Sequence, residues 1–403
     1  MRVPNVWRAL MNLAGVRVRR LKRHGRAFGH VLHRAGRKLR RSAEAVRTAP
    51  AIARAQMHRA GAVVERAGKR VSRFDDHVVT PYRSEWSVKQ LLARAASGER
   101  TVIIGPWTSE VGYEVLYWLP FLRWAMDRYA LRPERVVALS RGGTAAWYEG
   151  IARTYVEIFD LVEPAEFAEH ASTRRAQGDQ KQLTPSNFDR ELIALASRRL
   201  GLEGAGLWHP GLMYQLFRSF WYGDRSRHFL FRHTDFRYPR TVVADDELSL
   251  PGEYVAMKFY SGPALPDTEM NRALVRDLVE RVAARTPVVM LDTAWSTDEH
   301  RDYGFDGIAR VTTLRPALDP KTNLGVQTRV IAGARQFIGT CGGLAWLAPF
   351  LGVDTLAVYA DDRYLAAHLY AARYAYRRTG AAQFSTLNIS ALRDVTTALV
   401  KAS

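Results

Sequence analysis

The clearest chemical signal in this sequence is a strand, a glycine turn and an apolar helix between residues 334 and 360. Bare backbone N–H groups at the start of such a helix form a natural anion site, and a nucleotide phosphate is the usual anion there. The alternative is that the glycines only make the turn. In order, the pattern predicts a strand at Gln336–Gly339, a turn at Thr340–Gly343, a helix at Leu344–Leu351 ending at Gly352, and a strand at Thr355–Tyr359.

The turn itself is composed of Thr340, Cys341, Gly342 and Gly343. The threonine offers a hydroxyl and the glycines offer backbone N–H groups, so all four residues are candidates for binding a phosphate. Cys341 is the one cysteine of the chain, which rules out an internal disulfide. It is either a nucleophile or a small buried residue in a crowded turn, and the second interpretation is the more common one.

Two carboxylates, Glu110 and Glu114, follow the first predicted strand of the chain. A carboxylate at the mouth of a strand is placed to act as a general base toward an acceptor hydroxyl. The alternative interpretation of either residue is a favourable partner of the helix dipole.

Four further polar residues lie at strand ends or one helical turn apart: Lys258, Asp292, Asn323 and Gln327. The lysine follows a strand and is suited to meet phosphate oxygens, whereas the aspartate is suited to a ribose hydroxyl. The two amides are suited to read a ribose or a base. The structural alternatives are a lysine with its head in solvent, a turn aspartate and a helix-capping amide.

The sequence lacks the motifs of several common enzyme classes. It contains no Asp-x-Asp, no Walker lysine loop, no Gly-x-Gly-x-x-Gly and no His-Glu-x-x-His. These absences argue against an NTPase, a dehydrogenase or a zinc protease. The histidines are scattered without metal-ligand spacing. We therefore expect no metal cofactor.

The elements that must position these residues alternate between strands and helices in both halves of the chain. In the first half we expect strands at Thr101–Ile104 and Arg135–Leu139, a helix at Glu114–Tyr129, and a second helix running through Val156. Residues 163–245 are less regular and rich in aromatic side chains, which either fill a core or stack on a sugar, the core being favoured.

The second half repeats the alternation. The expected elements are a strand at 254–260, a helix at 268–285, a strand at 288–291, a helix at 325–334, the strand–turn–helix described above, and helices at 364–378 and 389–402. Such alternation predicts an α/β protein with two doubly wound, Rossmann-like domains that face each other across a cleft. The expected boundaries are a basic extension at 1–98, an N-terminal domain at 99–248 and a C-terminal domain at 249–403.

The basic extension carries almost all of the net charge of +19. Residues 1–75 contain 20 Lys and Arg against 3 Asp and Glu, whereas the rest of the chain contains 39 against 37. A helical basic arm is suited to binding an anionic membrane surface or nucleic acid, or to acting as a transit peptide. The plain alternatives are a solvated extension, or a start codon assigned too far upstream. We rank nucleic acid lower because few aromatic residues accompany the charges. The sequence contains no run of about 18 apolar residues, so we expect no transmembrane helix.

With both motifs placed, the chain resembles the GT-B glycosyltransferases, in pattern the heptosyltransferase-like bacterial enzymes, and more distantly the O-fucosyltransferase-like enzymes. The resemblance is carried by Phe337–Ala348 with Leu351-Gly352, and by the acid Glu114 six positions before Pro120. It implies Glu114 as the catalytic base, with Glu110 as its rival. It also implies an inverting transfer and a nucleotide sugar as co-substrate.

From this resemblance we expect an enzyme of bacterial polysaccharide biosynthesis. It would move a sugar from a nucleoside-diphosphate donor to a glycan or lipid-linked acceptor, without a metal. We expect it in the cytoplasm, peripheral on the inner face of the membrane through residues 1–75. The alternatives are a nucleic-acid-binding protein that uses the arm, a GT-B-fold scaffold without activity, and a pyruvyltransferase-like enzyme.

Overall fold

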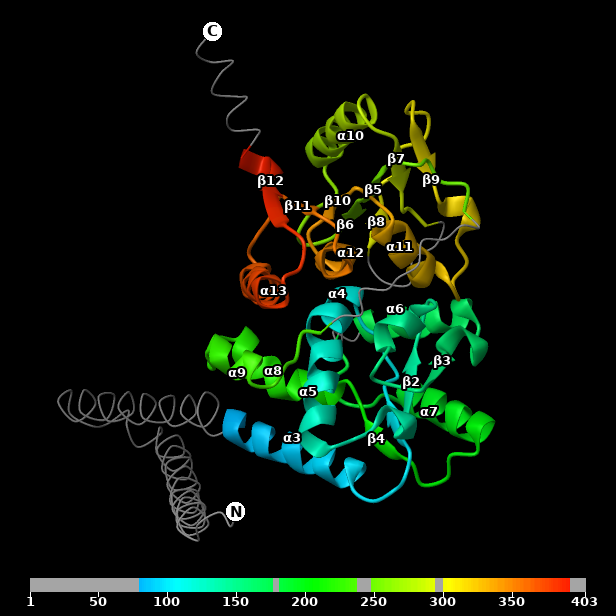
Figure 1. Cartoon of the computed structure of the whole chain (residues 1–403), viewed down its shortest axis with the longest axis vertical. Helices are drawn as coiled ribbons and strands as arrows, with labels where there is room; N and C mark the ends of the chain where they lie inside the picture. Colours follow the sequence, from blue (N-terminus) through cyan, green and yellow to red (C-terminus); the bar gives the residue numbers. More distant parts are fainter. Residues whose placement is uncertain (1–79, 177–180, 238–247, 294–299, 392–403) are drawn as a thin grey trace, which may run out of the picture. The chain divides into compact units, whose positions relative to one another are not determined.

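The fold is known from a computed structural model that describes residues 80–176, 181–237, 248–293 and 300–391 (Figure 1). Residues 85–403 form one compact unit, and both parallel sheets belong to it. Most of the predicted basic extension lies outside the described residues, which include only its part from residue 80 to 98, with helix α3 (Thr80–Ala96). Of the helices described, none has the length and apolar character needed to cross a membrane.

The N-terminal half is built on a parallel sheet of four strands in the order β3-β2-β1-β4. Its strands are β1 (Val102–Ile104), β2 (Val136–Ser140), β3 (Thr154–Glu157) and β4 (Gly206–Trp208). Strands β1 and β2 are buried along their whole length, as continuous apolar runs require. The helices are α4 (Val111–Tyr113), α5 (Leu119–Tyr129), α6 (Pro164–Ala176), α7 (Asn187–Leu200), α8 (Gly211–Trp221) and α9 (Arg227–Phe231).

The C-terminal half is built on a parallel sheet of six strands in the order β12-β11-β10-β5-β7-β9. These are β5 (Val255–Lys258), β7 (Val288–Met290), β9 (Val311–Thr313), β10 (Gln336–Thr340), β11 (Thr355–Tyr359) and β12 (Phe384–Asn388). A short antiparallel pair, β6 (Tyr260–Ser261) with β8 (Arg301–Asp302), accompanies it. The helices are α10 (Glu269–Ala283), α11 (Asn323–Ala332), α12 (Gly343–Leu347) and α13 (Ala366–Thr379).

Both sheets follow one topological rule. Numbered within each half, the strand order is 3-2-1-4 in the N-terminal sheet and 3-2-1-4-5-6 in the C-terminal sheet, which is the doubly wound order. The prediction of two Rossmann-like halves is therefore confirmed. In such sheets the strand order reverses between the first and fourth strands, and ligands bind at the carboxyl ends beside that point. In the C-terminal half, Lys258 and Thr340 end these two strands.

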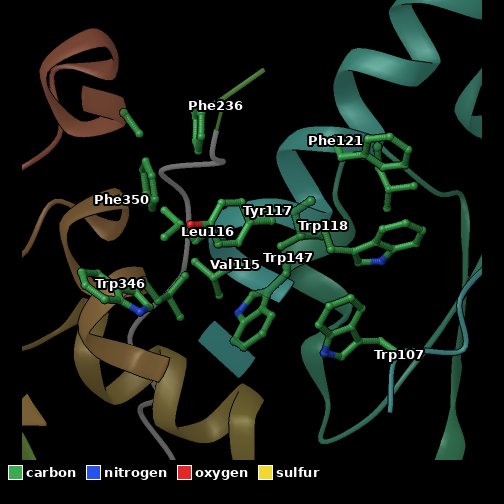
Figure 2. Close-up of a cluster of buried hydrophobic side chains, with 14 of the residues drawn as sticks. Trp107, Val115, Leu116, Tyr117, Trp118, Phe121, Trp147, Phe236, Trp346 and Phe350 are labelled. Carbon is green, nitrogen blue, oxygen red and sulfur yellow. The ribbon is translucent and has the colours of Figure 1, made fainter. Parts of the chain in front are cut away.

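Alternate residues along the strands face two different cores. In the C-terminal sheet Val255 and Met257 pack in a cluster with Val275 of α10, whereas Ala256 points into another cluster. That other cluster is shared, since it also contains residues of β1, β2, α5 and α12. Figure 2 shows part of it, with Leu116 near Trp346. The two halves are thus joined by one continuous apolar core, and the aromatic residues Trp208, Tyr214, Phe217 and Phe220 belong to it.

Local signals explain individual helix ends. Helix α7 begins with a capping box, in which Ser186 Oγ accepts a hydrogen bond from the Asp189 N–H at 3.0 Å and an Asp189 oxygen accepts one from the Ser186 N–H at 2.8 Å. It ends at Gly201, whose φ of +64° is left-handed. Gly352 closes the turn after α12 in the same way, with a φ of +83°.

Two predicted elements differ from the structure, and a third is described only in part. The helix expected through Val156 is a 3-10 turn at Thr144–Tyr148 followed by β3. Gly150, with a left-handed φ of +70°, ends the helical stretch, and the β-branched and aromatic residues of Thr154–Glu157 favour a strand. The helix expected at Leu344–Leu351 is the five-residue α12 followed by a 3-10 turn at Ala348–Leu351. The tail expected to be helical from Ile389 is helical at residues 389–391, directly after β12, and residues 392–403 lie outside the described ranges.

Candidate functional site

A cavity of about 600 Å³ lies at the carboxyl ends of the strands and is lined by both halves of the compact unit. The N-terminal half contributes the segment Glu110–Tyr113, together with Arg141 and Lys181. The C-terminal half contributes Lys258, Tyr260, Asn323, Gln327, Thr340, Cys341, Gly342, Gly343 and His368, among others. The structure therefore brings together the predicted glycine turn and one of the two predicted acids.

The glycine turn after β10 is held against Tyr260. The Thr340 hydroxyl accepts a hydrogen bond from the Tyr260 N–H at 3.0 Å and donates one to its carbonyl at 3.1 Å. Gly342 has a φ of +152° and Gly343 a φ of +35°. A Cβ on Gly342 would lie 2.6 Å from the Tyr260 hydroxyl, so a glycine is required on both steric and conformational grounds.

The helix that follows this turn is short, which weakens the helix dipole expected at the turn. Because α12 has five residues, few aligned peptide dipoles point at the turn, and the macrodipole contribution is small. Cys341 is buried, and burial raises the pKa of its thiol to about 12. A thiol of that pKa is protonated at neutral pH, so the interpretation as a small buried residue holds over that as a nucleophile.

Asn323 and Gln327 lie one turn apart on α11, and both line the cavity. The Gln327 side-chain N–H donates to Asn323 Oδ1 at 2.8 Å, while Asn323 Nδ2 donates to the Pro320 carbonyl at 3.2 Å. These bonds fix the orientation of both amides. Gln327 is 1% exposed, and its Oε1 has no hydrogen-bond partner among the described residues.

Lys258 ends β5 at the cavity, as predicted, but its ammonium group is already engaged. It donates to the Leu291 carbonyl at 2.7 Å and to Asp302 Oδ2 at 2.9 Å. The same Asp302 oxygen accepts from the Thr293 N–H at 2.8 Å. Lys258 therefore bridges the ends of β5 and β7 and presents a charge that is largely balanced.

Asp292 does not line the cavity, although the sequence placed it at the strand end. It is 3% exposed and accepts hydrogen bonds from the Arg315 guanidinium, with Nε at 3.0 Å, and from the Thr313 hydroxyl. Arg315 is 23 residues away in the sequence, so this pairing was not visible in the local pattern. In this structure Asp292 has a structural partner rather than a place on the cavity wall.

The two predicted acids occupy different environments. Glu110 lines the cavity, whereas Glu114 is 0% exposed and does not line it. Glu114 Oε1 accepts from the Ser140 hydroxyl at 2.8 Å and from the Tyr148 hydroxyl at 2.6 Å. Its Oε2 is buried and has no hydrogen-bond partner in the described part of the chain. Burial raises the pKa of Glu114 to about 7, against the opposing effects of Arg141 and the two hydroxyls.

Arg141 is a cavity residue that the sequence did not single out. It follows β2 directly, is 5% exposed, and donates from Nη2 to the Ser109 carbonyl at 2.8 Å. Its Nη1 is buried and lacks a hydrogen-bond partner among the described residues. A buried guanidinium nitrogen without a partner is costly unless a ligand accepts its hydrogen bond. The rule that ligands bind at the carboxyl ends of strands was the signal that pointed to this position.

Lys181 and His368 complete the cationic and aromatic side of the cavity. The Lys181 ammonium lies 4.8 Å from the centre of the Tyr113 ring. Burial lowers the pKa of Lys181, while the Glu110 carboxylate opposes that shift. His368 Nδ1 is hydrogen-bonded to the Tyr117 hydroxyl at 2.6 Å, and burial, followed by the charge of Lys181, lowers the pKa of His368 to about 4. His368 is therefore a neutral group at physiological pH.

The glycine loop of the N-terminal half does not offer its amides to the cavity. The Gly142 and Gly143 N–H groups donate to the two carboxylate oxygens of Glu157 at 3.0 and 2.8 Å. This loop also abuts α11, because the Gly325 N–H donates to the Gly142 carbonyl at 2.8 Å. The two halves are thus bonded through their backbones beside the cavity.

Within the residues that the structure describes, no group of three or more His, Cys, Asp or Glu side chains is arranged to hold a metal ion. No protein-family model matches the chain, and no curated protein sequence matches it.

Among solved structures, the chain is similar to the glycosyl transferase family 9 protein of Veillonella parvula, with 12% identity over 76% of this chain and 90% of that one and a TM-score of 0.38. It is also similar to the E. coli heptosyltransferase WaaC with ADP, with 18% identity over 74% of this chain and 99% of that one and a TM-score of 0.35. A third is the iron-containing dodecameric glycosyltransferase TibC of enterotoxigenic E. coli, with 13% identity over 64% and 58% and a TM-score of 0.33. At these values the likeness by itself assigns no activity to the chain.

Proposed function

We propose that this chain is a glycosyltransferase that moves a sugar from a nucleoside-diphosphate donor to a hydroxyl of a glycan or lipid-linked acceptor. One observation carries the proposal. A single cavity of about 600 Å³ is lined by the glycine turn of one half, and by a buried, incompletely paired arginine and a carboxylate of the other. These are the parts that transfer from a diphosphate needs: a place for the phosphates, a positive charge and a base.

The donor diphosphate binds between the Thr340–Gly343 turn and Arg141. The Tyr260 hydroxyl lies over Gly342, 2.6 Å from where a Cβ would stand, so the phosphates reach this part of the main chain as the Tyr260 side chain moves aside. Arg141 Nη1 supplies the charge-assisted hydrogen bond that the structure leaves unmade. This charge matters most as negative charge develops on the leaving diphosphate.

Glu110 is the base that we propose, in preference to Glu114. It lines the cavity, whereas Glu114 lies behind it with both hydroxyl partners pointing at one oxygen. In the transfer, the acceptor oxygen forms a bond to the anomeric carbon while the bond to the diphosphate breaks, and the diphosphate leaves with the electron pair. The acceptor proton passes to the Glu110 carboxylate, and the direct displacement inverts the configuration.

No step of this reaction requires a metal ion, because protein cations can balance the diphosphate. Arg141 and Lys181 line the cavity and supply this charge, whereas the Lys258 ammonium group is already paired with Asp302. We therefore expect a chelator to leave turnover unchanged. A loss of activity on chelation, restored by one added divalent ion, would show that the charge is supplied differently.

The proposal includes a location. With a net charge of +17 on residues 1–75, we propose that the protein acts in the cytoplasm at an anionic membrane face, where lipid-linked acceptors are found. The nucleic-acid alternative rests on the same charge. It makes a distinct prediction, since nucleoside diphosphates would then bind no better than simple salts do.

Isothermal titration of the full chain with UDP, GDP, ADP and CDP tests the proposal. We expect saturable binding of at least one, weakened about tenfold or more by Arg141→Ala, since a charged hydrogen bond contributes about 1.5–3 kcal/mol. Glu110→Gln is expected to retain binding and to lose turnover. The matched variant Glu114→Gln is expected to retain both. No binding of any of the four nucleotides would refute the proposal.

A further inference from the structure

Two large aromatic side chains of the N-terminal half are exposed and do not line the cavity. Trp86 on α3 is 66% exposed, and Tyr222, in the turn between α8 and α9, is 72% exposed. Each of these rings offers about 150–250 Å² of mostly apolar area to a partner. The name aromatic face is used below for Trp86 and Tyr222 together with the turn 222–225 and the residues of α3 next to Trp86.

The two rings come from neighbouring segments that are bonded to each other (Figure 1). Glu85, next to Trp86, pairs with Arg225 Nη2 at 3.3 Å and lies 3.7 Å from His233 Nε2. Glu85 also accepts from Lys89 on the same helix at 2.7 Å. These pairs hold the start of α3 against the turn that carries Tyr222. The two segments of the aromatic face are therefore held together by the ion pair of Glu85 with Arg225.

The surroundings of the aromatic face are cationic. The Arg218 guanidinium lies 5.6 Å from the centre of the Tyr222 ring, and Arg218, Arg227 and Arg232 are all exposed. In the sequence, the arm with 20 Lys and Arg against 3 Asp and Glu ends just before α3. In the sequence, this dense positive charge precedes the segment that carries the exposed Trp86.

We propose that the aromatic face docks on an anionic lipid bilayer, with Trp86 and Tyr222 inserted at the interface. Tryptophan and tyrosine favour the headgroup level, where the ring body is apolar and the polar tip remains hydrated. Each Lys or Arg near an anionic surface adds about 1 kcal/mol, and this part is screened by salt. Stable attachment takes two signals, and the aromatic face supplies an apolar signal in addition to the charge of the arm.

This inference does not depend on sugar transfer, and it is tested on the full chain without substrate. The wild-type protein is co-sedimented with vesicles of phosphatidylcholine alone and with added phosphatidylglycerol, at low and high salt. The test variant combines Trp86→Ser with Tyr222→Ser. The control combines Leu200→Ser with Met270→Ser, which removes two other exposed apolar side chains, on α7 and α10. Circular dichroism checks that each variant is folded.

We expect the wild type and the control to bind the anionic vesicles, with a fraction of the binding that persists at high salt. The aromatic double variant is expected to lose this salt-resistant fraction and to bind about tenfold or more weakly. Equal binding by the aromatic variant and the control would overturn the inference. Full release of the wild type by salt would also overturn it, because the arm would then be the sole attachment. A third contradicting result would be that an acidic polypeptide displaces the vesicles from the aromatic face.

Discussion

Replacing Glu114 by glutamine gives a sharp test of the buried carboxyl behind the cavity. Glu114 is fully buried, and only its Oε1 has hydrogen-bond donors, from Ser140 and Tyr148. Burial raises its pKa from the ordinary value of 4.5 to about 7. Glutamine keeps the shape and can keep the accepting oxygen, but it cannot ionise. The variant therefore removes the titration and little else.

The magnitude follows from the two pKa values. Below pH 4.5 the carboxyl is protonated in both the folded and the unfolded chain, and titration contributes nothing to stability. As the pH rises toward 7, the unfolded chain releases the proton while the folded chain retains it, so the free energy of unfolding falls. Above 7 the loss is complete, at about 3 kcal/mol for this difference in pKa. Glu114→Gln is expected to lack this fall.

The assay is denaturant unfolding across that pH range for the wild type, Glu114→Gln and the surface control Glu203→Gln. The control removes the same charge from an exposed position and so reports the effect of net charge alone. The stability of the Glu114 variant relative to the wild type should rise by about 3 kcal/mol from low to high pH. Any constant offset reflects the new amide N–H, which replaces an oxygen without a described partner. Parallel curves for all three proteins would refute the reasoning.

Two further substitutions test how the halves meet and what Asp292 does. Gly325→Ala places a Cβ 2.5 Å from the Gly143 carbonyl and should lower the free energy of unfolding by about 1–3 kcal/mol in thermal melting, whereas Gly252→Ala, with no described atom within 4 Å, should be neutral. Asp292→Asn should cost about 1–3 kcal/mol by weakening the pairing with Arg315 and leave nucleotide affinity unchanged. Equal melting of the two alanine variants, or an affinity loss in the asparagine variant, would contradict these assignments.

The central elements of the fold were predictable because they obey local rules. The apolar runs and glycine stops around β10, α12 and β11 set their boundaries, and the structure has Gln336–Thr340 and Thr355–Tyr359 as strands. The edge strand β3 was missed because it is only four residues long and most of its residues are only partly buried. The π-helical turn at Glu114–Trp118 between α4 and α5 has no sequence signal of its own.

The candidate site was predictable only where one segment supplies it. The Thr340–Gly343 turn was found because its residues are consecutive. Arg141 was not found, because its importance depends on the opposite half and on a hydrogen-bond partner that is absent from the described residues. Glu114 and Glu110 could not be ranked from the sequence, since spacing does not reveal which of two nearby acids faces the cavity. Asp292 pairs with Arg315, 23 residues away in the sequence, and this partner could not be predicted from the local pattern.

A structure of the protein with a bound nucleoside diphosphate tests the central claim most directly. We expect the two phosphates between the main chain of the Thr340–Gly343 turn and the Arg141 guanidinium, with Nη1 donating to a phosphate oxygen. We also expect Glu110 on the open side of the diphosphate, where an acceptor enters. Phosphates bound elsewhere, or a turn that remains covered by Tyr260 while the nucleotide sits at another surface, would contradict the account.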